Sequence, residues 1–458
     1  MSDIQTKEYP ERENKMGTMP VPKLLITMSL PMMISMLVQA LYNIVDSMFV
    51  AQLSEDALTA VSLAFPIQTL MIAVASGTGV GINALLSRNL GEKNFEGADS
   101  AAKNGLFLGI ASCIVFAVVG LLGSHFFFAL QTDNQTIVKY GTEYLTIITL
   151  CSAGIFLQIT FERLMQSTGK TIYNMITQGT GAIINIILDP IMIFGLFGFP
   201  RMEVAGAALA TITGQVVAVS MSFYFNATRN KEINISLKGF RPHAKTIAII
   251  YEVGVPSIIM QAIGSVMTFG MNKILLMFSS TAAAVFGVYF KLQSFIFMPV
   301  FGLNNGMIPI IAYNYGARNK KRITQAAKLS VLIAVTIMII GLIIFQTCSG
   351  FLLKNLFDAS ENMLSIGVPA LRIISLGFVV SGISVVASGA LEALGEGIPS
   401  FIISLLRYLV LIVPAASIGS RMFGITGVWA SFPVAEVLTA AAAAGIFTAR
   451  YRTCLKKL

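Results

Sequence analysis

Long apolar segments alternate with short polar and charged segments along almost the whole chain. One α-helix needs about 20 apolar residues to cross a bilayer whose hydrocarbon core is about 30 Å thick. The pattern therefore predicts twelve membrane-spanning helices, at residues 24–51, 60–86, 103–123, 140–161, 170–196, 204–227, 247–278, 283–312, 327–347, 364–391, 398–418 and 425–448. The expected fold class is an all-α polytopic membrane protein.

Composition agrees with this pattern. Of the 458 residues, 55% are hydrophobic and 12% are charged, whereas about a quarter of the residues of a soluble protein are charged. Few residues remain for a soluble domain. The first 22 residues are polar and contain no apolar core of a cleaved signal peptide, so we expect the first helix to stay in place as an anchor.

Cysteine and histidine offer little for metal or catalytic chemistry. The four cysteines have no metal-ligand or CxxC spacing, and the two histidines, His125 and His243, fall in predicted loops. A structural zinc site or a histidine-based catalytic triad needs more than this. We therefore expect neither an enzyme nor a bound cofactor or metal centre.

The formal charge is +9, and the basic residues that produce it fall mainly on one predicted side of the membrane rather than in a nucleic-acid-binding patch. Basic residues gather in the N-terminal segment, in alternate loops and after the last helix. The opposite side receives little beyond Lys139, Arg201, Lys354 and Arg421. Positive charge marks the cytoplasmic side, so both termini should be cytoplasmic and the number of spans even. We expect a multi-pass protein of the plasma membrane, in a bacterium the inner membrane, and no nucleic-acid partner.

The chain also repeats itself at an offset of 225 residues. About twelve of fifty positions from Ser54 to Lys103 are identical to their counterparts, against roughly three expected by chance. The shared residues include polar and small ones, which two apolar sequences would not share by accident: Gln68 falls on Gln293, Gly77 on Gly302, Gly91 on Gly316 and Asn94 on Asn319.

Each half would contain six spans, so both halves begin on the same side and form pseudo-symmetric six-helix lobes, as in parallel-repeat transporters. The basic segment from Arg229 to Lys245, which contains Gly239 and Pro242, is the natural link. We place the N-lobe at residues 1–237 and the C-lobe at residues 238–458. A site between such lobes can be exposed to the two sides alternately.

Ionisable residues inside membrane spans are costly and often functional. In the first span, Gln39, Tyr42 and Asp46 share one helical face, and in the fifth span Asn185 and Asp189 are one turn apart. Pro190 follows directly and can free a backbone carbonyl there. A buried carboxyl group that gains and loses a proton is the minimal part of a proton-coupled antiporter. The alternative is a permanent hydrogen-bonded pair that fixes helix packing.

Other polar residues in the spans are more ambiguous. Gln158, Glu162 and Gln166 form a third stripe, which either faces the interior or lies at the membrane interface beside Arg163 and Lys170. In the second half Asp46 falls on Met271, so acid chemistry is concentrated in the first half. Four charged residues in or near second-half spans are candidates for ion or substrate contacts, or for snorkelling or paired structural charges: Lys273, Lys291, Arg407 and Glu436.

These residues resemble the multidrug and toxic compound extrusion (MATE) family, in particular its DinF-like branch. The resemblance covers essentially the full length and is carried by Gln39 to Phe49, FERLMQSTG at 161–169, ILDPIMIFG at 187–195, GAALAT at 206–211, and the paired turns RNLGEKN and YNYGARN. It implies a two-lobed exporter driven by protons or sodium. It also implies a buried first-lobe network at Gln39, Tyr42, Asp46, Asn185, Asp189 and Thr211.

Two departures limit what can be carried over. Glu162 stands where some relatives have asparagine, and the tenth span lacks the acidic residue near its middle that other branches use, so their sodium mechanism does not transfer. Sodium binding at Asp46, Asn185 and Asp189 nevertheless remains an alternative to proton binding.

The sequence thus predicts a monomeric, cation-coupled and preferably proton-coupled exporter of amphipathic, often cationic organic compounds. The alternatives are a flippase for a lipid-linked precursor, a membrane-embedded transferase and, on composition alone, a channel.

Overall fold

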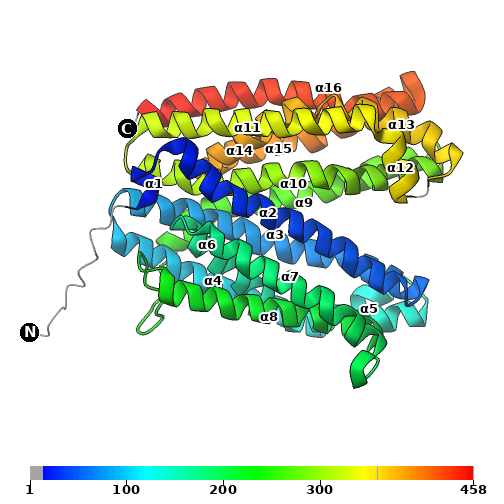
Figure 1. The fold of residues 1–458 in the computed structure, drawn as a ribbon, viewed down its shortest axis with the longest axis horizontal. Helices are drawn as coiled ribbons and strands as arrows, with labels where there is room; N and C mark the ends of the chain where they lie inside the picture. The colour runs from blue at the N-terminus through cyan, green and yellow to red at the C-terminus, as the bar shows by residue number, and fades with distance from the viewer. Residues whose placement is uncertain (1–13, 358, 457–458) are drawn as a thin grey trace, which may run out of the picture.

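The computed structural model describes residues 14–357 and 359–456, and within these ranges the chain is helical with no β-strand. The helices form two groups, with α2 running obliquely between them (Figure 1). The first half contains α1 (Lys15–Thr18), α2 (Val21–Ala51), α3 (Glu55–Gly91), α4 (Phe95–Ala129), α5 (Gln135–Leu150), α6 (Ala153–Ser167), α7 (Thr171–Phe194), η1 (Leu196–Gly198) and α8 (Glu203–Arg229). The second half contains α9 (Ala244–Leu276), α10 (Ser280–Gly316), α11 (Lys320–Thr347), α12 (Ser349–Phe357), α13 (Glu361–Ser375), α14 (Phe378–Ala393), α15 (Gly397–Leu405), η2 (Leu406–Ile412) and α16 (Val413–Lys456).

These helices make twelve crossings in the described ranges. The pairs α5–α6 and α13–α14 are single spans bent by 41° and 50°. The helical stretch Gly397–Cys454 is 58 residues long, too long for one crossing. It reverses at Gly424, whose φ is +62°, so that Gly419 and Gly427 pack directly against each other. The twelve predicted spans are confirmed, and the two bends are features that periodicity did not reveal.

The internal repeat is visible in how the helices begin. Ser54 and Ser279 are repeat equivalents, and each caps its helix by accepting a hydrogen bond from a backbone N–H at 3.0 Å. Asn94 and Asn319, also equivalents, cap α4 and α11 in the same way. A capping side chain satisfies one of the backbone donors left free at a helix start. The repeated polar residues therefore fix where equivalent helices begin.

The same repeat builds the contact between the halves. A side-chain carbon at Gly77 of α3 would overlap Ile258 of α9, and one at Gly302 of α10 would overlap Met33 of α2. Position 258 is the repeat equivalent of position 33. The two contacts are therefore related by the pseudo-two-fold axis. The repeated glycines allow backbone-to-backbone approach across the interface.

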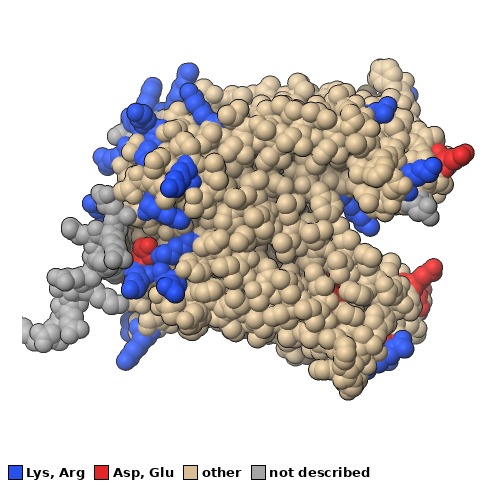
Figure 2. Space-filling model, in the orientation of Figure 1, with Lys and Arg blue, Asp and Glu red and all other residues tan. Residues whose placement is uncertain are grey.

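The halves meet at one end and separate at the other. Lys and Arg gather at the end where α1 and the C-terminal end of α16 lie, and the molecule is hollowed between the halves at the opposite end (Figure 2). At the basic end, Gly91 packs on the Tyr313 carbonyl and Gly316 packs on the Arg88 carbonyl. The structure is closed at its basic end and open at the other.

Candidate functional site

A pair of acidic side chains lies where α2 and α7 pack together. Asp189 on α7 is fully buried, and Asp46 on α2 is half-buried. The two carboxyl groups are close enough to interact electrostatically. An ionised carboxylate only accepts hydrogen bonds, so the two groups can hydrogen-bond to each other only when one of them carries a proton. The structure thus brings the two predicted acids, 143 positions apart in the sequence, close together.

Three further predicted residues surround this pair. Asn185 lies one turn before Asp189, and its side-chain nitrogen is 3.4 Å from Asp189 Oδ1 and 3.2 Å from the Thr211 hydroxyl. With the amide turned over, Asn185 donates to Asp189 Oδ2 at 3.1 Å and accepts from the Thr211 backbone N–H at 3.0 Å. The buried hydroxyl of Tyr42 lies near Thr211 and close enough to Asp46 to interact with it electrostatically. α2, α7 and α8 therefore meet in one polar network.

Gln39 is not part of this network. It lies on the same face of α2 as Tyr42 and Asp46, but its side chain is exposed and has no hydrogen-bond partner among residues 14–357 and 359–456. One oxygen of Asp46, Oδ1, is buried without a partner in the same described ranges. The carboxyl pair consequently has unused capacity for a proton or a ligand.

Two residues at the site were missed by the sequence analysis. Gln68 of α3 donates to the hydroxyl of Tyr144 of α5 at 2.8 Å. Tyr144 is buried and close enough to Asp46 and Tyr42 to interact with them electrostatically. The identity of Gln68 and Gln293 in the repeat was the available signal, since a glutamine is seldom kept by chance in an apolar span.

The Glu162 side chain faces the protein interior and not the membrane interface, the two alternatives that the sequence left open. Its side chain is 5% exposed. Oε1 accepts hydrogen bonds from Gln158 at 3.0 Å and Thr177 at 3.2 Å, and Oε2 accepts one from Gln178 at 2.6 Å. Three neutral donors thus hold the carboxyl group in place between α6 and α7.

We expect Glu162→Gln to cost less than about 1 kcal/mol in stability, because the partner amide of Gln178 can turn over and accept from the new donor. The Gln178 oxygen is buried without a partner in the described ranges, so it is free to do this. Glu162→Leu should cost about 2 kcal/mol or more, because it leaves buried donors unsatisfied. Thermal unfolding in detergent measures the difference, and equal losses would contradict the assignment.

Neighbouring polar residues join the two halves near the basic end. Arg163 donates to Gln166 at 2.9 Å and, across the interface, to the Asn305 side chain of α10 at 3.2 Å. Gln166 also donates to the backbone carbonyl of Asn305. The third predicted stripe is therefore divided, because Gln158 and Glu162 bond within the first half while Gln166 reaches the second.

An acid that the sequence analysis missed lies beside this contact. Glu392, near the end of α14, is 7% exposed and accepts from Ser257 at 3.3 Å and Ser400 at 3.4 Å. It also interacts electrostatically with Arg163. Glu392 lies just past the predicted tenth span, at its basic end, which is why it was not considered as an intramembrane acid.

The second-half charged residues lie away from the carboxyl pair. Lys273 and Lys291 are exposed, and Lys273 lies over the ring of Phe269 at 5.9 Å. Neither lysine is brought to Asp46 or Asp189. Arg407 and Glu436 instead form a buried ion pair, with Nε and Oε1 2.7 Å apart, so the paired interpretation of these two residues is confirmed.

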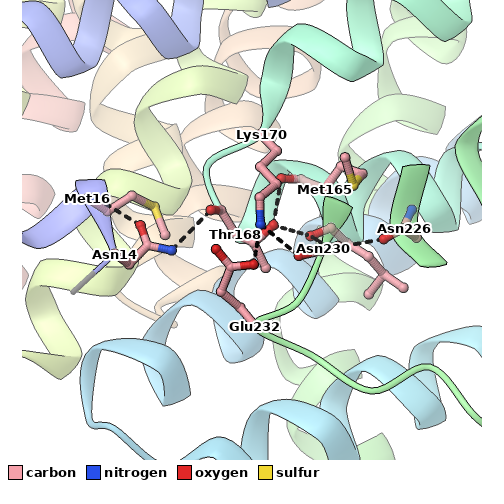
Figure 3. Close-up of polar contacts among 9 residues, drawn as sticks. Asn14, Met16, Met165, Thr168, Lys170, Asn226, Asn230 and Glu232 are labelled. Atoms are coloured by element: carbon pink, nitrogen blue, oxygen red, sulfur yellow. Dashed lines mark hydrogen bonds and ion pairs between the residues drawn. The ribbon is translucent and has the colours of Figure 1, made fainter. Parts of the chain in front are cut away.

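The segment around α1 bridges the halves over the closed end. In Figure 3 the Asn14 side chain points to Thr168 of the first half, whose carbonyl accepts at 3.1 Å. On the other side, Arg322 of α11 donates to the carbonyls of Met16 at 2.9 Å and Met19 at 2.7 Å. Periodicity did not predict this four-residue helix, which is held by both halves.

Charged residues lie beside this bridge. Lys170 forms an ion pair with Glu232 and a hydrogen bond with Asn230 at 3.4 Å, and the three side chains converge in Figure 3. Lys15 lies beside them. Burial lowers the pKa of the Lys15 ammonium, Lys170 lowers it further, and Glu232 opposes both. The Lys170–Glu232 pair lies within the first half, so the segment is tied to that half by the Asn14 hydrogen bond rather than by charge.

We expect Arg322→Met to loosen this segment without unfolding the protein. Hydrogen bonds from a charged donor contribute roughly 1.5–3 kcal/mol, so the amides of residues 16–19 should exchange with solvent at least about tenfold faster. Hydrogen exchange followed by mass spectrometry measures this, with the exposed neighbour Lys321→Met as the control. Unchanged exchange in Arg322→Met would show that the segment is held by other contacts.

Comparison with known proteins agrees with the repeat and the fold. A family model described as MatE matches residues 31–191 and 256–418, once in each half. The multidrug export protein MepA of Staphylococcus aureus (strain MSSA476) is 27% identical over 425 residues, covering 93% of each chain. An FAD transporter of Shewanella oneidensis is 28% identical over 425 residues, covering 92% of each.

A solved structure of similar fold matches this chain over almost its full length. The outward-facing conformation of a multidrug resistance MATE family transporter of the MOP superfamily is 27% identical, covers 98% of each chain and superimposes with a TM-score of 0.90. Because the two matched segments together cover well over half of the chain, the protein belongs to the MatE family of multi-pass membrane transporters.

Proposed function

We propose that this protein is a secondary-active multidrug exporter that exchanges protons for amphipathic organic compounds by alternating access between its two halves. The observation that carries the proposal is that two acids, Asp46 and Asp189, lie close enough together inside a transporter fold to share a proton. The relative named as a multidrug export protein supports the substrate class.

The orientation follows from charge. The basic end carries the excess of Lys and Arg that marks cytoplasmic loops, so we assign it, with both chain termini, to the cytoplasm. The opposite end, where the halves separate (Figure 2), then faces outward. In this assignment the half-buried Asp46 can receive protons from the outside.

Protonation acts on α2 because this helix packs on both halves. α2 contacts α7 of the first half and α10 of the second, and Pro31 removes one of its internal hydrogen bonds. Two ionised carboxylates in contact repel each other, whereas one bound proton lets Asp46 and Asp189 share a hydrogen bond. Proton binding therefore draws α2 toward α7 and changes the surface that α2 presents between the halves, which lowers the affinity for a bound substrate.

Sodium is the alternative coupling ion. Oxygen atoms of Asp46, Asp189, Asn185 and Thr211 converge at the site and are chemically suited to a hard cation. A proton needs only the carboxyl pair, so we favour it.

The test measures export of ethidium, a cationic dye, from proteoliposomes that contain the protein. FAD is the second compound tested, because one relative is named an FAD transporter. An imposed pH gradient and an imposed sodium gradient are applied separately to the wild-type protein. We expect the pH gradient alone to drive dye export. Export driven only by sodium would replace the coupling ion. No gradient-dependent movement of either compound, together with movement of labelled lipid, would favour the flippase.

A further inference from the structure

A pocket of about 370 Å³ opens on the surface of the second half, at the basic end of the molecule. It lies between the first turn of α11 and the last turns of α16, where Lys and Arg gather in Figure 2. Its lining residues are Lys320, Phe447, Thr448, Tyr451, Arg452 and Lys456. Three cations therefore share a pocket that no acidic residue of the described ranges lines.

The three cations are exposed and lack a partner of opposite charge. Lys320, Arg452 and Lys456 form no ion pair with an acid of residues 14–357 and 359–456. Arg322, two residues after Lys320, differs because backbone carbonyls of the α1 segment accept its hydrogen bonds. Like charges that converge without a counter-ion repel each other, and a bound anion would remove that repulsion. The pocket is therefore electrostatically suited to an anion.

The first half contains the same place in a covered form. Two pairs of repeat equivalents mark it: Phe95 with Lys320, and Asp99 with Thr324. The linker after α8 crosses this part of α4, and the backbone N–H of Asn234 donates to Asp99 Oδ1 at 2.7 Å. In the second half, Thr324 is hydrogen-bonded to the Tyr451 hydroxyl at 2.7 Å instead. The described part of the chain leaves the pocket beside this bond open.

An apolar stripe leads from the pocket along the surface of α16. Spacings of three and four residues place its exposed residues on one helical face: Val434, Leu438, Ala441, Gly445, Thr448 and Arg452. The small side chains of Ala441 and Gly445 leave room beside Thr448. About 15 Å of helix separates Thr448 from Leu438, which is half the thickness of a bilayer core of about 30 Å. A lipid whose headgroup fills the pocket would therefore lay its chains on this stripe for the depth of one leaflet.

The aromatic residues of the pocket favour the same kind of ligand. The rings of Phe447 and Tyr451 stack with their centroids 4.9 Å apart. Aromatic residues are enriched where the hydrocarbon core meets the lipid headgroups. The pocket thus combines cations, an interfacial aromatic pair and an adjoining apolar surface, whereas a soluble anion would need only the cations.

We propose that this pocket binds the headgroup of an anionic phospholipid, with Lys320, Arg452 and Lys456 around its phosphate and its acyl chains on the stripe of α16. A zwitterionic headgroup carries a cation that these residues repel, so the pocket prefers a lipid of net negative charge. The inference goes beyond the proposed function and takes from it only the orientation. That orientation places the pocket in the cytoplasmic leaflet, whose anionic lipids attract basic residues.

Native mass spectrometry of the purified, delipidated full-length protein measures this binding without a gradient. The probes are dioleoylphosphatidylglycerol, which is anionic, and dioleoylphosphatidylcholine, which has the same chains and is zwitterionic. Each basic residue near an anionic headgroup contributes about fivefold in affinity, so we expect the wild type to prefer phosphatidylglycerol by at least about tenfold. The triple variant Lys320→Gln, Arg452→Gln, Lys456→Gln should reduce this preference to about twofold or less.

The matched control is the triple variant Arg229→Gln, Lys231→Gln, Lys238→Gln, which removes the same charge from exposed residues of the first half, outside the pocket. It should keep the wild-type preference. Equal losses in the two triple variants would show that net charge alone attracts the lipid, and would overturn the inference. Thr448→Glu adds a negative charge to the pocket and should weaken phosphatidylglycerol binding about tenfold, so it decides if the first triple variant does not fold.

Glycerophosphoglycerol, the same headgroup without acyl chains, distinguishes a lipid from a soluble phosphate compound. It should not displace phosphatidylglycerol from the wild type at equal concentration, because it has no chains to lie on the stripe. Displacement at equal concentration would show an anion site and not a lipid site, and equal binding of the two phospholipids would show no headgroup preference. Either result would contradict the inference, and neither depends on whether the protein exports any compound.

Discussion

Replacing Asp189 by asparagine is expected to reduce export driven by a pH gradient to the level of protein-free liposomes while the protein remains folded. Asparagine has the size of a protonated aspartic acid, and its amide can still donate to Asp46. The contact between α2 and α7 should therefore persist, but the group can no longer release a proton. Asp46→Asn should have the same effect from the other side of the pair.

The measurement is dye efflux under an inward proton gradient, with thermal unfolding in detergent recorded for each variant. Asp133→Asn is the matched control, because Asp133 is exposed in the loop between α4 and α5. Its efflux should equal that of the wild type. Normal pH-driven export by Asp189→Asn would contradict the hypothesis that this pair couples proton binding to transport. The pair would then serve only to fix helix packing.

The double variant Gly91→Ala, Gly316→Ala is expected to open the basic end and to abolish most transport. At both positions the added carbon would overlap a backbone carbonyl of the other half, that of Tyr313 for Gly91 and that of Arg88 for Gly316. A backbone atom cannot turn aside as a side chain can. Overpacking typically costs 1–3 kcal/mol per site, so the pair should shift the ratio of closed to open basic ends by about thirtyfold or more.

Spin labels on cysteines introduced at Glu92 and Ala317 measure this opening. Both positions are exposed, and they follow Gly91 and Gly316 directly. The distance between the labels should be longer and more broadly distributed in the double variant. Gly123→Ala on α4 is the control, because nothing lies within 4 Å of a side-chain carbon there. An unchanged distance in the double variant would show that the halves adjust without separating.

Much of the fold could be predicted because its signals are local or periodic. Membrane spans follow from apolar length, and the two halves follow from identities such as Gly91 with Gly316. The bends between α5 and α6 and between α13 and α14 were not predicted. No proline occupies the break at Cys151–Ser152 or at Leu376–Gly377, so the bends depend on packing against neighbouring helices.

The candidate site could be predicted in part for the same reason. Asp46 and Asp189 were identified because a carboxyl group in an apolar span is costly, and Asn185 because it lies one turn from Asp189. Gln68, Tyr144 and Glu392 were missed. A tyrosine or glutamine in a span is unremarkable until its partner is known, and those partners lie on other helices.

What the sequence determined by itself is the number of crossings, the duplication, the excess of basic residues at one end and the presence of two intramembrane acids on α2 and α7. Each of these depends on residue type and on spacing within one helix. Only the tertiary structure decided that the acids lie close together, that Gln39 stays outside their network, that α1 bridges the halves, and that Arg407 pairs with Glu436. These features depend on which helices pack together and at what angle, because a contact between side chains on different helices is fixed by the packing of both and leaves no period along the chain.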